Sequence, residues 1–151
     1  MFDRPHHNAI ATVLHALDAH LLLRAEAWFG GGTAIVLNLG EYRESVDIHF
    51  LCASQDGYRL LREATFGGSL EKITLPGSGV VQLREVRADQ YGIRTQIEVD
   101  GTRIKFEIVR EARITLAGGM DIRLGVRSCR AAICIARSFW QMRTAMPTRQ
   151  S

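Results

Sequence analysis

Apolar residues recur with helical spacing in three stretches of the first half of the chain. The longest stretch is residues 9–28, whose apolar positions are Ile10, Val13, Leu14, Leu17 and Leu21. This spacing predicts one amphipathic helix. Residues 33–39 and 55–66 repeat the pattern over shorter lengths, and each is followed by glycine, which commonly ends a helix. We therefore expect three helices before residue 67.

Strand patterns dominate the rest. A near-continuous apolar run at residues 46–52 predicts a central strand that is buried on at least one face. Residues 80–87, 93–99 and 103–109 alternate between apolar and polar positions, as strands do when one face is covered. Asp100 and Gly101 separate the last two and favour a two-residue hairpin. Residues 114–116 and 120–124 are expected to form a last hairpin around Gly118 and Gly119.

Composition bounds the class of protein. The chain has 151 residues, enough for one domain with a real core, and its 46% hydrophobic and 23% charged content is ordinary for a globular protein. No apolar run has the length of a membrane span, and the first residues lack the layout of a signal peptide. We expect a cytoplasmic protein without a membrane partner, whose three cysteines are reduced thiols.

Candidate chemistry is concentrated in residues 29–50, FGGGTAIVLNLGEYRESVDIHF. The glycine run ending at Gly32, followed by Thr33 at the start of a predicted helix, is typical of a backbone that approaches a phosphate closely. Asp47 and His49 are two positions apart on a predicted strand, so both point to one face, where they are potential metal ligands. The segment therefore predicts a nucleotide site. The alternative is structural: Asp47 accepts hydrogen bonds from the backbone or Ser45, and His49 packs at a sheet end.

Two residues of a later strand extend this hypothesis. Glu107 projects from the polar face of residues 103–109 and is a candidate third ligand if that strand adjoins the strand of Asp47. Lys105, on the same face, is a candidate for neutralising phosphate charge. The alternative is a solvated strand face, on which Glu107 is paired across the sheet to Glu98 or Arg94. Four histidines near the N-terminus have no acidic or cysteine partner at matching spacing, so we expect surface or core roles for them: His6, His7, His15 and His20.

The opening segment closely resembles the nucleotidyltransferase domain of the AbiEii/AbiGii toxin family, which pairs a Gly-Gly-Thr/Ser motif with a downstream Asp-x-Asp. DGYRLLRE, YGIRTQIEVDG and IKFEIVREARI also read like this family, so the resemblance covers residues 8–125. It implies an α+β fold of the nucleotidyltransferase type, with a small mixed β-sheet flanked by helices. It also implies transfer of a nucleotide from a nucleoside triphosphate to an acceptor, which is tRNA for characterised relatives, in toxin–antitoxin and phage-defence systems.

Site residues follow from this resemblance position by position. Gly31, Gly32 and Thr33 match the phosphate-binding motif, while Ser45 and Asp47 match the start of the metal motif. Mg²⁺ or Mn²⁺ is the implied cofactor and a cognate antitoxin the implied partner. His49 stands where the second acid belongs, and imidazole suits manganese or zinc better than magnesium. The expected site is therefore Asp47, His49 and Glu107 for metal, with Gly31, Gly32, Thr33, Ser45 and Lys105 for the nucleotide.

The C-terminal segment does not fit the family pattern. We divide the chain into a nucleotidyltransferase-like domain, residues 1–125, and an atypical basic tail, residues 126–151. Residues 127–151 carry a charge of +5 with no acid, which leaves −2 for the remainder. The family has a helix with a lysine and an arginine here, and residues 128–143 encode such a helix in another reading frame when codons are suitably chosen. Our hypothesis is that a frameshift replaced this region; nucleic-acid contact is the other interpretation of the tail.

Three functions remain open at this point. The first is an AbiEii-type nucleotidyltransferase, with activity reduced by His49 and the altered C-terminal segment. The second is a non-catalytic remnant that binds a nucleotide or an antitoxin. The third is a nucleotidyltransferase of small molecules, related to antibiotic-modifying enzymes.

Overall fold

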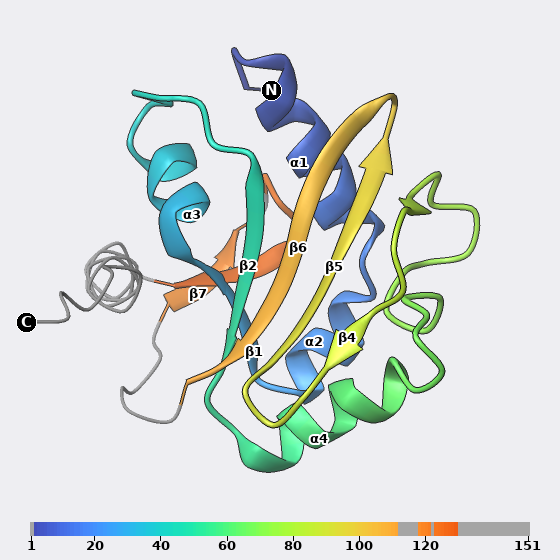
Figure 1. Ribbon diagram of the computed structural model, residues 1–151. Helices are drawn as coiled ribbons and strands as arrows, with labels where there is room; N and C mark the ends of the chain where they lie inside the picture. Colours follow the sequence, from blue (N-terminus) through green and yellow to red (C-terminus); the bar gives the residue numbers. More distant parts are fainter. Residues whose placement is uncertain (1, 112–117, 122, 130–151) are drawn as a thin grey trace, which may run out of the picture.

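A mixed sheet forms the centre of the protein (Figure 1). The computed structural model describes residues 2–111, 118–121 and 123–129. Within them the strand order is β3-β5-β6-β2-β1-β8-β7, and β4 pairs with β5 beside β3. The helices are α1 (Pro5–Ala16), α2 (Ala19–Arg24), α3 (Gly31–Asn38) and α4 (Gln55–Ala64). The strands are β1 (Ala27–Gly30), β2 (Asp47–Cys52), β3 (Val81–Gln82), β4 (Arg87–Ala88), β5 (Gly92–Val99), β6 (Thr102–Arg110), β7 (Gly118–Asp121) and β8 (Val126–Cys129).

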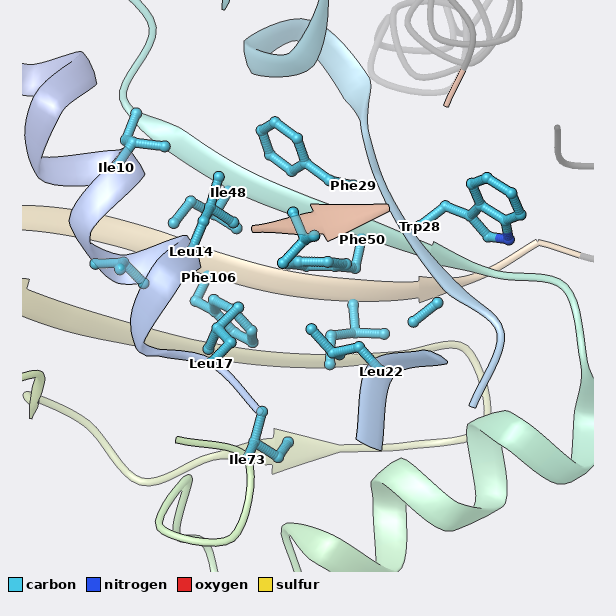
Figure 2. Packing of buried hydrophobic residues seen from close by; sticks show 14 of the residues in the cluster. Ile10, Leu14, Leu17, Leu22, Trp28, Phe29, Ile48, Phe50, Ile73 and Phe106 are labelled. Atoms are coloured by element: carbon cyan, nitrogen blue, oxygen red, sulfur yellow. The ribbon is translucent and has the colours of Figure 1, made fainter. Parts of the chain in front are cut away.

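Strand β2 is central, as its apolar run predicts. It pairs antiparallel with β1, where Phe50 faces Phe29, and parallel with β6, where Ile48 faces Phe106. The rings of Phe29 and Phe50 lie 5.9 Å apart and those of Phe50 and Phe106 lie 6.1 Å apart, both tilted. Figure 2 shows side chains of α1 and α2 packing over these aromatic residues. Burial of this apolar face is the main stabilising contribution to the sheet.

The predicted helix at residues 9–28 is wrong, because the structure divides this stretch into α1, α2 and β1. Leu17 is extended and forms a bridge with Thr74, and Asp18 then caps α2 by accepting a hydrogen bond from the Leu21 amide. Glu26 has a φ of 54°, which turns the chain into β1. The apolar spacing continues through these breaks because all three elements face the same core. Periodicity alone therefore could not locate them.

The hairpin at Asp100 and Gly101 is confirmed: both residues have left-handed backbones, with φ of 48° and 78°, and β5 pairs with β6 across them. The strand predicted at residues 80–87 is only two short segments, β3 and β4. Between them the Val86 amide donates to the Gly68 carbonyl, which takes this part of the chain off the β5 ladder.

The last hairpin differs from the prediction. Strands β7 and β8 pair around a turn that ends at Gly125, whose φ is 71°, whereas the expected residues 114–116 lie outside the described part of the chain. Strand β8 also pairs parallel with β1, with Phe29 opposite Ser128. The first four residues that we assigned to the basic tail thus belong to the sheet, because β1 offers them a free edge. Residues 130–151, on which the frameshift hypothesis rests, lie outside the described residues.

No helix in the described residues is long and apolar enough to cross a membrane.

Candidate active site

The glycine turn joins β1 directly to α3 (Figure 1). Gly30 ends β1 opposite His49 and is the residue that precedes the first turn of α3. Gly31 has a φ of 77°, and a Cβ at this position would lie 3.2 Å from the Cβ of His49. Glycine is therefore required both by the backbone and by the close approach of β2. The turn places the amino end of α3, with N–H groups that have no partner within the helix, beside the predicted metal strand.

Arg43 is a further candidate for the site, which the sequence alone did not single out. Its Nη2 lies 3.1 Å from the position of a Cβ on Gly32, so the guanidinium covers the first turn of α3. Its Nη1 donates a 3.4 Å hydrogen bond to the Glu44 carbonyl, and the side chain is exposed. An arginine in the polar turn between a glycine motif and Asp47 was the available signal. Arg43 adds positive charge where a phosphate is expected.

Thr33 and Ser45 are brought together, but their hydroxyl hydrogens are already used. The Thr33 hydroxyl donates to the Asp47 carbonyl, so the 2.5 Å contact between the Thr33 and Ser45 oxygens must have Ser45 as its donor. Neither hydroxyl retains a hydrogen for a phosphate oxygen in this arrangement. Phosphate binding at the predicted Gly31–Thr33 motif therefore has to come from backbone N–H groups, while the two hydroxyls fix the start of β2.

The Asp47 side chain lies in the first of two polar rows that cross the sheet. Asp47 is opposite Lys105 on β6, and Lys105 is opposite Gln96 on β5. Within the described residues the Asp47 carboxylate has no hydrogen bond or ion pair; only its main-chain carbonyl accepts one, from Thr33. The expected structural role for this carboxylate is thus not what the structure shows. A half-exposed carboxylate beside a lysine and the glycine turn is available to a ligand.

The second row contains His49, Glu107 and Arg94. His49 Nε2 lies 3.3 Å from Glu107 Oε2, and Arg94 Nε donates to Glu107 Oε1 at 3.1 Å. The expected adjacency of the two strands is confirmed, and so is the alternative pairing of Glu107 with Arg94. Both oxygens of Glu107 already have cationic or hydrogen-bonding partners. Glu107 therefore lies in the row next to Asp47, with one carboxylate oxygen paired to His49 and the other to Arg94.

The hydrogen bond from His49 lowers the pKa of Glu107 to about 2; burial opposes this shift, and Arg94 adds to it. Because this pKa lies below the ordinary value of 4.5, the pair contributes stability above about pH 4.5 that is lost as the pH falls toward 2.

We expect Glu107→Gln to remove part of the acid sensitivity of the wild type. Urea unfolding midpoints at pH 6, 4.5 and 3 measure this. Glu98→Gln is the control, since the ion pair of Glu98 with the exposed Arg103 is a long 3.9 Å contact. An equal effect of both changes would contradict the assignment.

The donor set fits one cation better than two. No group of three or more His, Cys, Asp or Glu side chains in the described residues is arranged to hold a metal ion. Asp47 offers a free carboxylate, whereas His49 and Glu107 are paired with each other. Mg²⁺ is commonly held by one or two carboxylates together with substrate phosphates and water. Asp47 is therefore the residue that fits such an ion, and the three-ligand set that we predicted stays a prediction.

His7 does have an acidic partner, which its sequence spacing does not reveal. Its Nδ1 lies 2.7 Å from Glu41 Oε1, although the two residues are 34 positions apart. His15 instead contacts the Arg123 carbonyl through Nε2. His15 is exposed and His7 is buried, so both fit the expected surface or core roles, and His7 also connects α1 to the turn that precedes β2.

Comparison with solved structures shows the fold. JHP933 from Helicobacter pylori is 14% identical, with a TM-score of 0.51 over 99% of this chain and 61% of that one. MenT4, a nucleotidyltransferase toxin from Mycobacterium tuberculosis, is 18% identical, with a TM-score of 0.50 over 93% of this chain and 55% of that one. A Helicobacter pylori protein assigned as a nucleotidyltransferase is 15% identical, with a TM-score of 0.50 over 87% of this chain and 55% of that one. The chain thus spans little more than half the length of these structures.

Sequence comparison shows the family. No curated protein matches the chain. The family model for the nucleotidyl transferase AbiEii toxin of type IV toxin–antitoxin systems matches residues 13–126, which include the glycine turn, β2, β5 and β6. With the α+β architecture and the free Asp47 carboxylate beside that turn, this match shows that the chain belongs to the AbiEii family of nucleotidyltransferase toxins.

Proposed function

We propose that this protein transfers a nucleotide from a nucleoside triphosphate to tRNA in the cytoplasm, as a toxin restrained by a cognate antitoxin. The observation that carries the proposal is the free Asp47 carboxylate, which lies between the glycine turn and Lys105. The family match supports the reaction class.

The reaction is a substitution at the α-phosphorus. An acceptor hydroxyl oxygen forms the new P–O bond, the bond to the β-phosphate oxygen breaks, and pyrophosphate leaves while the hydroxyl proton passes to water or a base. Backbone N–H groups of α3 and the Arg43 guanidinium hold phosphate oxygens, and Lys105 offsets negative charge beside Asp47. Mg²⁺ or Mn²⁺ at Asp47 would supply electrostatic stabilisation of the phosphates and the leaving group.

A groove over β5, which lies on the opposite side of β6 from β2, supports a polyanionic acceptor. It has a volume of about 560 Å³ and is lined by Arg84, Glu85, Arg87, Arg94, Thr95, Gln96 and Lys105. Arg87 lies opposite Arg94 in the β4–β5 register, so the second polar row continues to the edge of the sheet. Arg94 is already paired with Glu107, which leaves three cations of the lining, Arg84, Arg87 and Lys105, against one acid, Glu85. This excess of positive charge attracts a phosphate backbone and repels a cationic small molecule. This charge pattern favours tRNA over the antibiotic-type substrate.

A non-catalytic remnant is the second candidate, because His49 replaces the second acid and is itself paired with Glu107. Restoring an acid by His49→Asp places two carboxylates side by side, an arrangement that is stabilised only when a cation binds between them. With Mg²⁺ we expect this variant to transfer nucleotide at least tenfold faster than the wild type. With Mn²⁺, which accepts imidazole more readily, we expect a smaller difference.

The experiment is incubation of wild type and His49→Asp with each labelled nucleoside triphosphate and with bulk tRNA, in Mg²⁺ or Mn²⁺. Labelled tRNA from either protein supports the enzyme. Triphosphate binding measured by equilibrium dialysis, without transfer by either protein, favours the remnant and overturns the enzyme. Transfer to a small amine or alcohol acceptor, with none to tRNA, overturns the choice of acceptor.

A further inference from the structure

A buried hydrogen-bond chain joins α1 to the start of β2. His7 is fully buried, and its ring is bonded at both nitrogens: Nδ1 to Glu41 Oε1 at 2.7 Å and Nε2 to the Ser45 amide at 2.9 Å. A backbone N–H can only donate, so Nε2 accepts and Nδ1 carries the hydrogen that Glu41 receives. The contacts thus define one neutral tautomer of His7.

Glu41 is held in place on its other side by the N-terminal segment. Its carboxylate accepts from the Asp3 amide at 2.8 Å and the Arg4 amide at 3.2 Å, and its carbonyl accepts from Arg4 Nε at 3.3 Å. Burial alone would raise the pKa of Glu41, but the hydrogen bonds from Asp3, His7 and Arg4 outweigh it and lower the pKa. Glu41 also has a φ of 56°, which is uncommon for a residue with a side chain. The surrounding contacts hold this conformation against its intrinsic cost.

The chain continues from Ser45 to the backbone of Asp47, the residue that carries the predicted catalytic carboxylate. The Ser45 hydroxyl donates to Thr33 on α3, and Thr33 donates to the Asp47 carbonyl. Three elements are therefore linked in sequence: α1 through His7, the glycine-motif helix through Thr33, and β2 through the backbone of Asp47. The helix α3 and the strand β2 carry the two halves of the proposed site, and His7 holds the Ser45 peptide in the turn between them.

We propose that His7 is a positioning residue for nucleotide transfer: its neutral ring fixes the Ser45 peptide, which sets the Asp47 carboxylate relative to the glycine turn. This inference rests on the proposed function for its catalytic consequence, but the geometric part stands without it. His7 touches no atom of a substrate; it acts through Ser45 and Thr33.

Two substitutions separate positioning from bulk stability. His7→Gln keeps one donor for Glu41 and one acceptor for Ser45, whereas His7→Leu keeps a similar volume and removes both. Val13→Ala is the control, because Val13 is fully buried on the same helix and its truncation costs stability without touching this chain of hydrogen bonds. The variants are compared at a temperature where unfolding curves show all of them folded.

Native-state amide exchange and ¹⁵N spectra of the His7 ring form the first readout. We expect His7 as the Nδ1–H tautomer, at least tenfold faster exchange of the Ser45 amide in His7→Leu than in Val13→Ala, and a return to within threefold of wild type in His7→Gln. An Nε2–H tautomer, or equal exchange in His7→Leu and Val13→Ala, would overturn the proposal whether or not the protein is an enzyme.

Transfer kinetics form the second readout, on whichever of the wild-type or His49→Asp backgrounds shows activity. We expect kcat to fall at least tenfold in His7→Leu, with KM for the triphosphate changed less than threefold, and to recover in His7→Gln. If kcat in His7→Leu falls no more than in Val13→Ala, the catalytic consequence is wrong. If neither background transfers nucleotide but Ser45 exchange responds as expected, the proposed function fails while the positional role of His7 stands.

Discussion

Replacing Asp47 by Asn is expected to lower the rate of nucleotide transfer by a factor of at least about 10³, while leaving the protein folded. The carboxylate has no partner within the described residues, so its removal breaks no internal contact. An amide of the same shape keeps the β2 backbone but loses the negative charge that would hold a divalent cation beside the phosphates. A factor of 10³ corresponds to about 4 kcal/mol of transition-state stabilisation. Labelled transfer to tRNA measures the loss, and circular dichroism with urea unfolding measures the fold.

Asp100→Asn is the matched control for this exchange. Asp100 lies in the β5–β6 turn with a φ of 48°, a conformation that asparagine adopts at least as well. The Asp100→Asn change removes the same charge at a distance from the glycine turn, and we expect its activity to stay within twofold of the parent protein. Asp47→Asn with activity within tenfold of its parent would show that this carboxylate is not a metal ligand. Wild-type or His49→Asp protein, whichever is active, serves as the parent.

The second large effect is on stability and concerns Gly57 in α4. Alanine is favoured over glycine in a helix by about 1 kcal/mol. A Cβ at Gly57, however, would lie 2.0 Å from the carbonyl oxygen of Ala25 and 2.9 Å from its Cα. The obstacle is backbone, and the Ala25 carbonyl also accepts a hydrogen bond from the Cys52 thiol. Since the steric cost exceeds the helix preference, we expect Gly57→Ala to lower the free energy of unfolding by about 3 kcal/mol. Urea denaturation at 25 °C measures the change.

Gly32→Ala provides the comparison within another helix. There the nearest atom to the new Cβ is Arg43 Nη2 at 3.1 Å, the end of a flexible side chain that can move aside. We expect stability within about 0.5 kcal/mol of wild type or slightly higher, because the helix preference is no longer opposed. Gly57→Ala unfolding at the same urea concentration as Gly32→Ala would contradict the contact between α4 and Ala25.

The elements that could be predicted from the sequence are those whose own residues carry an apolar or turn pattern. Strands β2, β5 and β6 and the Asp100 turn carry their own apolar and turn signals, and these predictions were confirmed. Strand β1 was missed because its residues continue the apolar spacing of α1 and α2 toward the same core. Its identity as a strand depends on pairing with β2, which no local pattern encodes.

For the candidate site, too, some features follow from local sequence and others depend on the tertiary fold. Asp47 and His49 share a face because two positions on a strand always do. The pairing of His7 with Glu41 depends instead on where α1 packs, across 34 positions of sequence. The placement of Arg43 over Gly32 likewise depends on how the polar turn folds back onto α3. Residue types were visible in the sequence, but the partners of these side chains are a product of the tertiary fold.

Parallel pairing of β2 with β6 also sets the order in which the protein can assemble. The β5–β6 hairpin involves neighbouring residues and can form soon after both strands leave the ribosome. Asp47 is synthesised long before its register partner Lys105, and β1 before the β8 strand beside it. Closing such distant pairs is slow because loop-closure entropy precedes the stabilising contacts. Nascent chains that carry only the glycine turn and Asp47 therefore lack the β6 half of the site, and the nucleotide-binding surface is complete only after β6 has been added.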